Sequence, residues 1–256
     1  MAKKYYVVWQ GRETGIFSDW ATCKKQIDKF AGARYKSFAS LAEAEAAFGG
    51  RASSAIKAAG AGPAAKRYSA QTVKTYTAAE IDKLAAEVKI FTDGGCEPNP
   101  GKAGSGLALY RDKQLAELWY GLYNPMGTNN TAELNAFNQA LIMAAQEVAL
   151  GQRVAIFCDS KYAIQCVTQW AVAWQKKGWK KAGGEIKNLA LIQEMFERYQ
   201  TLKDKIQVLH VNGHVGVEGN ELADRMSIHA IAEKQTGFKA YPQALNIQAI
   251  LALRAG

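Results

Sequence analysis

Two carboxylates follow apolar segments that have the composition of strands. Asp93 comes after residues 88–92 and precedes two glycines, and Asp159 comes after residues 154–158. Ligand sites in open α/β sheets lie beyond the carboxyl ends of the strands. If the two strands are parallel neighbours, about 4.8 Å apart, these side chains converge. Two anions that close repel unless a cation lies between them, so the pair predicts a cation site. For either residue alone, a capping aspartate at a strand-to-loop turn remains the alternative.

Two more acids lie in segments that are expected to be helical. Glu133 falls in TNNTAEL at the start of an amphipathic segment, and Asp224 closes VNGHVGVEGNELAD. The alternatives for Glu133 are a capping-box partner of Asn130 and a first-turn acid at the positive end of the helix, and for Asp224 the alternative is a solvated helix position. Carboxylate oxygens suit Mg²⁺, and two such ions about 3.5–4 Å apart can activate water and stabilise a leaving oxygen. Four acids would neutralise two dications, with one carboxylate bridging them.

The elements that must position these acids form an alternating pattern. Strands are expected at residues 88–93, 106–111, 115–122, 153–159 and 206–211, and helices at 130–149, 162–174, 186–199 and 218–233. This order predicts an α/β domain with a mixed five-stranded sheet flanked by helices.

The rest of the chain suggests a second, smaller domain. We expect residues 1–48 to form a small α+β unit, residues 49–86 to be a flexible Ala/Gly-rich basic linker, and residues 87–236 to be the α/β domain. Residues 237–256 form a C-terminal region to which the sequence assigns no role.

The charge balance indicates a polyanionic partner. The chain of 256 residues has 32 basic and 23 acidic side chains, a net charge of +9. The alternative is that a basic protein is merely kept soluble by its charge.

Composition excludes a collagen-like or wholly disordered chain. The sequence contains no apolar run of about 18 residues, the length that would predict a membrane span. The four cysteines have no CxxC spacing, and residues 1–10 contain no secretory signal. We therefore expect a cytoplasmic protein, and we expect a monomer.

Four motifs together resemble the type-one ribonuclease H signature. They are TDGGCEPNPG, TNNTAEL, FCDSKY and VNGHVGVEGNELAD, and residues 5–38 resemble the hybrid-binding domain that precedes the catalytic domain in many of these enzymes. The resemblance implies the ribonuclease H fold and an endonuclease that cuts the RNA strand of RNA/DNA hybrids, leaving 5′-phosphate and 3′-hydroxyl ends. It implies catalysis by two Mg²⁺ ions, with Mn²⁺ as a substitute. The implied catalytic acids and metal ligands are Asp93, Glu133, Asp159 and Asp224, and His214 matches an auxiliary loop histidine.

The resemblance also implies how the hybrid is held. The residues that line the substrate would be Cys96, Asn99, Asn129, Asn130 and Ser160, and Thr128 with Asn99 could hold a phosphate of the DNA strand. For each asparagine alone, turn or cap chemistry is the alternative. A protruding basic segment would contribute Trp170, Trp174, Lys176, Lys177 and Lys180. The alternative for the two tryptophans, which are one helical turn apart, is that they belong to the core.

In the small domain, the resemblance implies aromatic contacts from Tyr6, Trp20 and Tyr35, with Arg12 and Lys36 beside the phosphates. In so small a domain aromatic residues otherwise form the core. Two other functional classes stay open at this stage: a catalytically weak protein that binds hybrid or double-stranded RNA, and another nuclease of the same fold, such as a DNA transposase or exonuclease.

Overall fold

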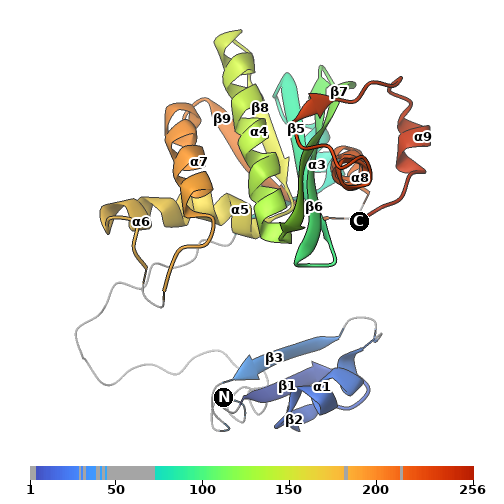
Figure 1. Cartoon of the computed structure of the whole chain (residues 1–256), viewed down its shortest axis with the longest axis vertical. Helices are drawn as coiled ribbons and strands as arrows, with labels where there is room; N and C mark the ends of the chain where they lie inside the picture. Colours follow the sequence, from blue (N-terminus) through green and yellow to red (C-terminus); the bar gives the residue numbers. More distant parts are fainter. Residues whose placement is uncertain are drawn as a thin grey trace. The chain divides into compact units, whose positions relative to one another are not determined.

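The computed structural model describes residues 4–28, 30, 33–38, 41, 44, 73–181, 184–213 and 216–256. The chain divides into two compact units, Met1–Tyr68 and Ser69–Gly256, and each is considered by itself (Figure 1). Residues 49–72, the first part of the expected linker 49–86, lie outside the described residues. None of the helices in the described ranges is both long and apolar enough to cross a bilayer.

The small unit is an antiparallel sheet with an eight-residue helix, α1. Its elements are β1 (Tyr5–Gln10), β2 (Gly15–Phe17), α1 (Trp20–Ile27) and β3 (Arg34–Phe38), with strand order β2-β1-β3. Asp19 caps α1 by accepting a hydrogen bond from the Thr22 amide at 2.8 Å. Val7, Val8 and Cys23 are buried. The predicted α+β character is confirmed.

The large unit is built on a mixed sheet. Its strands are β4 (Thr75–Tyr76), β5 (Val88–Glu97), β6 (Gly101–Arg111), β7 (Gln114–Gly127), β8 (Val154–Cys158), β9 (Ile206–Val211) and β10 (Lys239–Ala240). The order is β10-β7-β6-β5-β8-β9-β4, in which β5, β8, β9 and β4 run parallel and the other pairings are antiparallel. The five predicted strands form the centre. Two short edge strands, β4 and β10, extend the sheet to seven strands, a difference from the predicted five.

Helices cover both faces of this sheet (Figure 1). One face carries α4 (Asn129–Ala149), α5 (Lys161–Gln165), the π-helical turn Cys166–Trp170, α6 (Ala171–Lys176) and α7 (Leu189–Leu202). The other face carries α3 (Ala78–Asp82), α8 (Glu218–Ala232) and α9 (Ile247–Leu251). Each layer has its own buried apolar cluster, centred on Phe137 and Ile156 on the first face and on Phe91 and Phe157 on the second. The predicted ribonuclease H-like α/β architecture is confirmed.

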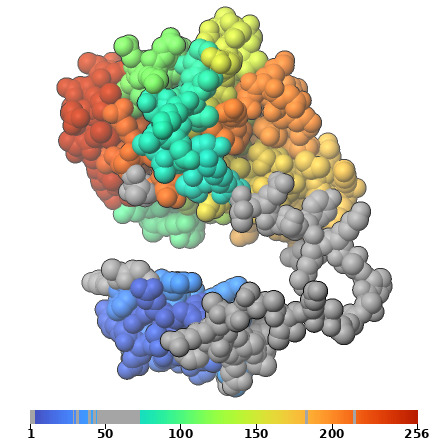
Figure 2. Space-filling view, turned by 180° about the vertical axis from the view of Figure 1, so that it is seen from behind, coloured from blue at the N-terminus to red at the C-terminus, as the bar shows by residue number. Residues whose placement is uncertain are grey.

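Residues 73–86 do not behave as the end of a linker, which corrects the predicted boundary at residue 86. β4 pairs in parallel with β9, and Thr77 and Glu80 form a reciprocal capping box at the start of α3. Ile81 is buried in the second apolar cluster. Figure 2 shows this teal segment on the surface of the large unit. Burial of the Ile81 side chain removes apolar surface from water, and this stabilises the packing of the segment on the large unit.

The C-terminal region is also part of the fold. β10 pairs with β7, and the Tyr241 amide donates to the Leu118 carbonyl at 2.8 Å. Phe238 stacks on Trp119 with ring centroids 5.9 Å apart. α9 then packs against α8 through the buried Ile250. In Figure 2 the red residues of this region gather at one edge of the large unit.

The position of Ile81 gives a test of the domain boundary. We expect Ile81→Ala to lower the free energy of unfolding of the full chain by about 2–4 kcal/mol, because it leaves a cavity between α3 and the sheet. Urea denaturation at equilibrium measures this, with the exposed Lys83→Ala on the same segment as the matched control. Equal stability of the two variants would mean that residues 73–86 are a linker after all.

Candidate active site

β5 brings Asp93 into the site from the middle of a strand rather than from its end. The strand continues through Gly94 and Gly95 to Glu97, because these residues pair with β6, and this corrects the predicted end at Asp93. β5 pairs in parallel with β8, with Thr92 opposite Cys158, which meets the condition under which the two aspartates were expected to converge. A Cβ atom on Gly94 would lie 2.2 Å from the Glu133 backbone nitrogen. Glycine therefore lets α4 approach β5 closely enough to place Glu133 beside Asp93.

Glu133 projects from the first turns of α4. The N-cap of this helix is Thr128, whose hydroxyl accepts a hydrogen bond from the Thr131 amide at 3.2 Å. Glu133 is therefore not the capping-box acid that the sequence left open. Its side chain is buried, and its Oε2 atom has no hydrogen-bond partner among the described residues. Burial of a carboxylate oxygen without a hydrogen-bond donor costs free energy, so a ligand bound at this atom would stabilise the site.

Asp159 follows β8 directly, as predicted, and is held by residues from α8 and β9. Its Oδ2 atom accepts a hydrogen bond from Asn220 Nδ2 at 3.2 Å, and its backbone carbonyl lies 3.0 Å from His210 Nε2. His210 Nδ1 in turn lies 2.8 Å from the Thr75 hydroxyl on β4. Sequence reasoning gave no role to His210 or Asn220. Their supporting role depends on the packing of β4 and α8, which no local motif reveals.

Asp224 reaches the same place from α8. This helix lies so close to β6 that a Cβ atom on Gly106 would be 2.1 Å from the Ala223 carbonyl. Asp224 is buried, and its Oδ2 atom accepts a hydrogen bond from Arg225 Nη1. From the next turn of α8, Ser227 donates to Asp93 Oδ2 at 3.2 Å. The helix therefore supports both aspartates.

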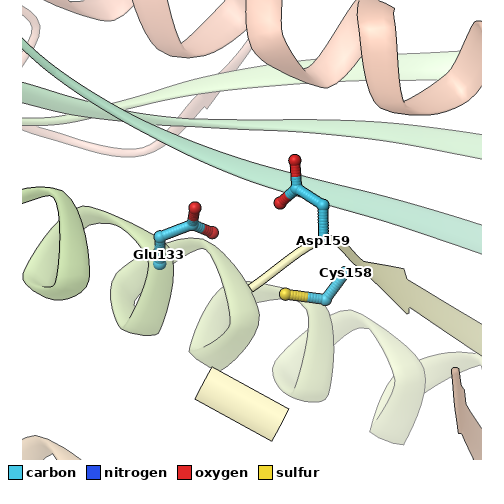
Figure 3. A group of neighbouring side chains, drawn as sticks. All are labelled: Glu133, Cys158 and Asp159. Atoms are coloured by element: carbon cyan, nitrogen blue, oxygen red, sulfur yellow. The ribbon is translucent and has the colours of Figure 1, made fainter. Parts of the chain in front are cut away.

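The four acids line one cavity of about 650 Å³, which we call the acid pocket. One ligand atom each from Glu133, Cys158 and Asp159 lies within 4.8 Å of the others, and the two carboxylates face the same space (Figure 3). Burial, with added repulsion from Asp159 and Asp224, raises the pKa of Asp93 to about 8. Burial, with repulsion from Asp93 and Asp159, raises the pKa of Glu133 well above its usual range. These are acids that lack a counter-charge, so a cation fits the pocket.

The Cys158 sulfur belongs to this group of neighbouring ligand atoms but is a poor ligand. Burial, followed by repulsion from Glu133 and Asp159, raises the pKa of its thiol, which therefore stays protonated. Metals bind the thiolate rather than the thiol. The oxygen atoms that remain suit a hard cation such as Mg²⁺ or Mn²⁺.

The predicted substrate residues divide into two groups. Cys96, Asn129 and Ser160 line the acid pocket. Asn99, Thr128 and Asn130 are not among the pocket's lining residues within the described ranges, although Asn99 Oδ1 accepts a hydrogen bond from the Asn129 amide at 3.2 Å. Ser160 also caps α5 by accepting from the Ala163 amide at 3.2 Å.

The basic segment presents its lysines and packs its tryptophans. Lys176, Lys177 and Lys180 are exposed. Trp170 and Trp174 are half-buried against the first apolar cluster, with ring centroids 5.9 Å apart. Both tryptophans therefore contribute to the packing of the core, which is the alternative that the sequence left open.

In the small unit, three aromatic side chains form one group. The rings of Tyr6 and Trp20 are 5.4 Å apart, and those of Trp20 and Tyr35 are 5.8 Å apart. Trp20 and Tyr35 are 43% and 47% exposed, so the group is not the domain core.

The two predicted cations of the small unit have intramolecular contacts. Arg12 Nη1 donates to the carbonyl oxygens of Lys25 and Asp28 at 2.8 and 2.7 Å, where it binds the end of α1. Lys36 Nζ lies 5.7 Å from the Phe38 ring centroid. His214, the predicted auxiliary histidine of the large unit, lies outside the described residues.

The fold and the pocket define an α/β protein whose carboxylate centre is suited to divalent cations. The RNase H family model matches residues 85–232, and the model described as the ribonuclease H1 N-terminal domain matches residues 4–48. The chain is 31% identical to ribonuclease H1 of Mus musculus over 264 residues, with 87% of each chain covered. It is 38% identical to a ribonuclease H of Pseudomonas aeruginosa over 148 residues, which cover 57% of this chain and 95% of the relative.

A solved structure shares the fold. The foamy viral protease-reverse transcriptase, determined in complex with an RNA/DNA hybrid, superposes with a TM-score of 0.51 at 18% identity, covering 67% of this chain and 23% of that one. The chain belongs to the ribonuclease H family, whose members are metal-dependent endoribonucleases that act on RNA/DNA hybrids.

The raised pKa of Asp93 predicts an unusual pH dependence in the absence of metal. Between its ordinary value of 3.8 and about 8, this carboxyl holds its proton in the folded chain and loses it in the unfolded chain. The contribution of this group to stability is therefore greatest at low pH and falls as the pH rises toward 8, by about 1.4 kcal/mol per pH unit. We expect Asp93→Asn to reduce this fall and to stabilise the metal-free protein at pH 8.

Urea denaturation in EDTA at pH 5 to 8 measures the effect. The control is Asp204→Asn, which removes an exposed carboxylate from the turn before β9. A metal-free stability that rises with pH, or a destabilised Asp93→Asn, would contradict the repulsion inferred among the pocket acids.

Proposed function

We propose that the chain hydrolyses the RNA strand of RNA/DNA hybrids with two Mg²⁺ ions, for which Mn²⁺ can substitute, and that it leaves 5′-phosphate and 3′-hydroxyl ends. One observation carries this proposal. Four acids from one strand, one strand end and two helices, Asp93, Asp159, Glu133 and Asp224, share a pocket in which Asp93 and Glu133 lack a counter-charge. Membership of the ribonuclease H family supports the same reaction.

The residues of the pocket fit the proposed ions. Glu133 Oε2 is buried without a hydrogen-bond donor among the described residues, and the neighbouring ligand atoms are carboxylate oxygens. When bound, a pair of divalent ions supplies charge that activates water and stabilises the leaving oxygen. Asp93, Glu133, Asp159 and Asp224 would hold the ions. Ser227 and Asn220 orient two of these carboxylates by donating hydrogen bonds to Asp93 and Asp159.

Selection of a hybrid requires groups that test for the 2′-hydroxyl. Cys96, Asn129 and Ser160 border the acid pocket, where an RNA strand next to the scissile phosphate would pass. The exposed Lys176, Lys177 and Lys180 supply phosphate contacts that are independent of sequence. In our proposal, the small unit holds the same duplex, which raises the local concentration of phosphates at the catalytic unit.

The compartment and the oligomeric state also remain proposals. We infer that the protein acts in a reducing cytoplasm, because Cys23, Cys96, Cys158 and Cys166 are all free thiols. We also infer a monomer, which light scattering of the full chain would test.

Asp93→Asn tests the chemistry. We expect the full chain to cleave only the RNA strand of a matched set of RNA/DNA, RNA/RNA and DNA/DNA duplexes, with Mg²⁺ and not with EDTA. Asp93→Asn should lower the rate at least about 10³-fold, because it removes a charge that the ions need, while hybrid binding is retained. End-labelled products identify the 5′-phosphate and 3′-hydroxyl.

Asp204→Asn, in an exposed turn, is the control and should cleave at the parent rate. Binding of hybrids by the parent without any cleavage would leave only a binding protein. Rapid cleavage by Asp93→Asn would refute the assignment of the acids.

The aromatic group of the small unit gives a separate prediction. Trp20→Ala with Tyr35→Ala should weaken binding of a long hybrid by about 2 kcal/mol, roughly 30-fold in Kd, because two exposed rings that contact the duplex are lost. The rate at saturating hybrid should stay close to that of the parent. The control is Trp9→Ala, whose ring lies outside this group and packs against Phe38. An unchanged Kd for the double variant would show that the aromatic group of the small unit does not bind the hybrid.

A further inference from the structure

A short stretch of chain after α9 enters the acid pocket. Residues 252–256, which we call the tail segment, leave the end of α9 and return beside α8 (Figure 1). α9 is anchored by the buried Ile250, so the start of the tail segment is fixed against α8. Arg254 and Gly256 line the same cavity as Asp93 and Asp224.

The tail segment bonds directly to one of the acids. The Gly256 amide donates to both carboxylate oxygens of Asp224, at 3.0 Å to Oδ1 and 3.2 Å to Oδ2. A Cβ atom on Gly256 would lie 2.6 Å from Asp224 Oδ1, so a larger residue here would displace the Asp224 side chain or the segment. A second contact holds the segment, since Arg254 forms an ion pair with Glu97 at the end of β5.

Arg225 completes the set of donors around Asp224. Its Nη1 atom donates to Asp224 Oδ2, and its Nε atom donates to the Leu251 carbonyl at 3.4 Å, at the point where α9 ends. Arg225 therefore contacts both the acid and the helix from which the tail segment leaves. Both oxygens of Asp224 accept hydrogen bonds in this arrangement.

A carboxylate offers about four lone-pair sites, and three hydrogen-bond contacts from Gly256 and Arg225 already lie on the oxygens of Asp224, so the Gly256 amide leaves little space there for a cation. Mg²⁺ needs carboxylate oxygens at close range in a defined geometry, and an N–H group directed at those oxygens occupies the same space. The positive Arg254 at the cavity edge adds repulsion toward a dication. The Arg254–Glu97 pair is exposed at both ends, and exposed pairs are weak, so release of the segment is easy.

We propose that the tail segment shields Asp224 from divalent cations, so that cation binding requires its release. This inference rests on the proposed function only in taking Asp224 as a metal ligand. When a cation-competent state is populated for a fraction of the time, the observed Kd exceeds the intrinsic value by the inverse of that fraction. A segment seated about 75–90% of the time would weaken cation binding about 4- to 10-fold. Phosphates of a bound duplex would attract Arg254 away from Glu97, which couples substrate binding to release.

Mn²⁺ binding to the full chain tests this, measured by calorimetry and by the electron paramagnetic resonance signal of free Mn²⁺. Gly256→Pro removes the competing N–H, and Arg254→Ala removes the anchor. Each should lower the Kd for Mn²⁺ about 4- to 10-fold. Arg254→Lys, which retains the ion pair with Glu97, is the matched control and should bind Mn²⁺ as the parent does. In an Asp224→Asn background, Gly256→Pro should have no effect.

An unchanged or higher Kd in both Gly256→Pro and Arg254→Ala would overturn the inference, and a higher Kd would show that the segment assists binding. Circular dichroism checks that each variant is folded, and Arg254→Ala tests the proposal independently if Gly256→Pro is not. Cleavage at saturating Mg²⁺ separates this result from the proposed function. Tighter Mn²⁺ binding without any hybrid cleavage would retain the shield and refute the nuclease, whereas cleavage with unchanged Mn²⁺ binding would do the reverse.

Discussion

Electrostatic repulsion among buried carboxylates is the constraint on which the large unit depends. Asp93, Glu133 and Asp224 are each less than a tenth exposed, and their side chains converge from β5, α4 and α8. Without a counter-charge, burial and mutual repulsion hold protons on Asp93 and Glu133 at pH values where acids are normally ionised. The two buried apolar clusters on either face of the sheet offset this cost. The pocket therefore lowers the stability of the metal-free protein, and a bound cation would offset this loss.

Glycines make this convergence geometrically possible. Gly94 lets α4 approach β5, and Gly106 lets α8 approach β6, in each case at distances that a Cβ atom would prevent. The acids supply the charge, and the glycines allow the close backbone approach that brings these charges together. The polar residues Ser227, Asn220 and His210 then restrict how two of the acids lie. In the same pocket, the Gly256 amide approaches Asp224 closely enough to donate to its carboxylate.

Much of this could be predicted from the sequence, because local patterns carried it. The apolar runs before Asp93 and Asp159, and the amphipathic period of residues 130–149, predicted parallel strands and a helix that the structure contains. Other features depend on contacts between distant residues. Gly94 and Gly95 resembled a strand end, yet β6 pairs with them and extends β5 to Glu97. Residues 73–86 resembled a linker because of the Ala/Gly-rich stretch before them, although the Thr77–Glu80 capping box was a readable signal. The contact of Gly256 with Asp224 has no signature in sequence at all.

The central claim is that the four acids jointly bind divalent cations. Anomalous X-ray scattering from crystals of the full chain soaked in Mn²⁺ tests it most directly. The account predicts anomalous peaks in the acid pocket, within direct coordination distance of carboxylate oxygens of Asp93 and at least one of its three partners. It also predicts that these peaks are lost in Asp93→Asn. Crystals that show no Mn²⁺ in the pocket at saturating concentration, or that show Mn²⁺ bound only elsewhere on the protein, would contradict the account.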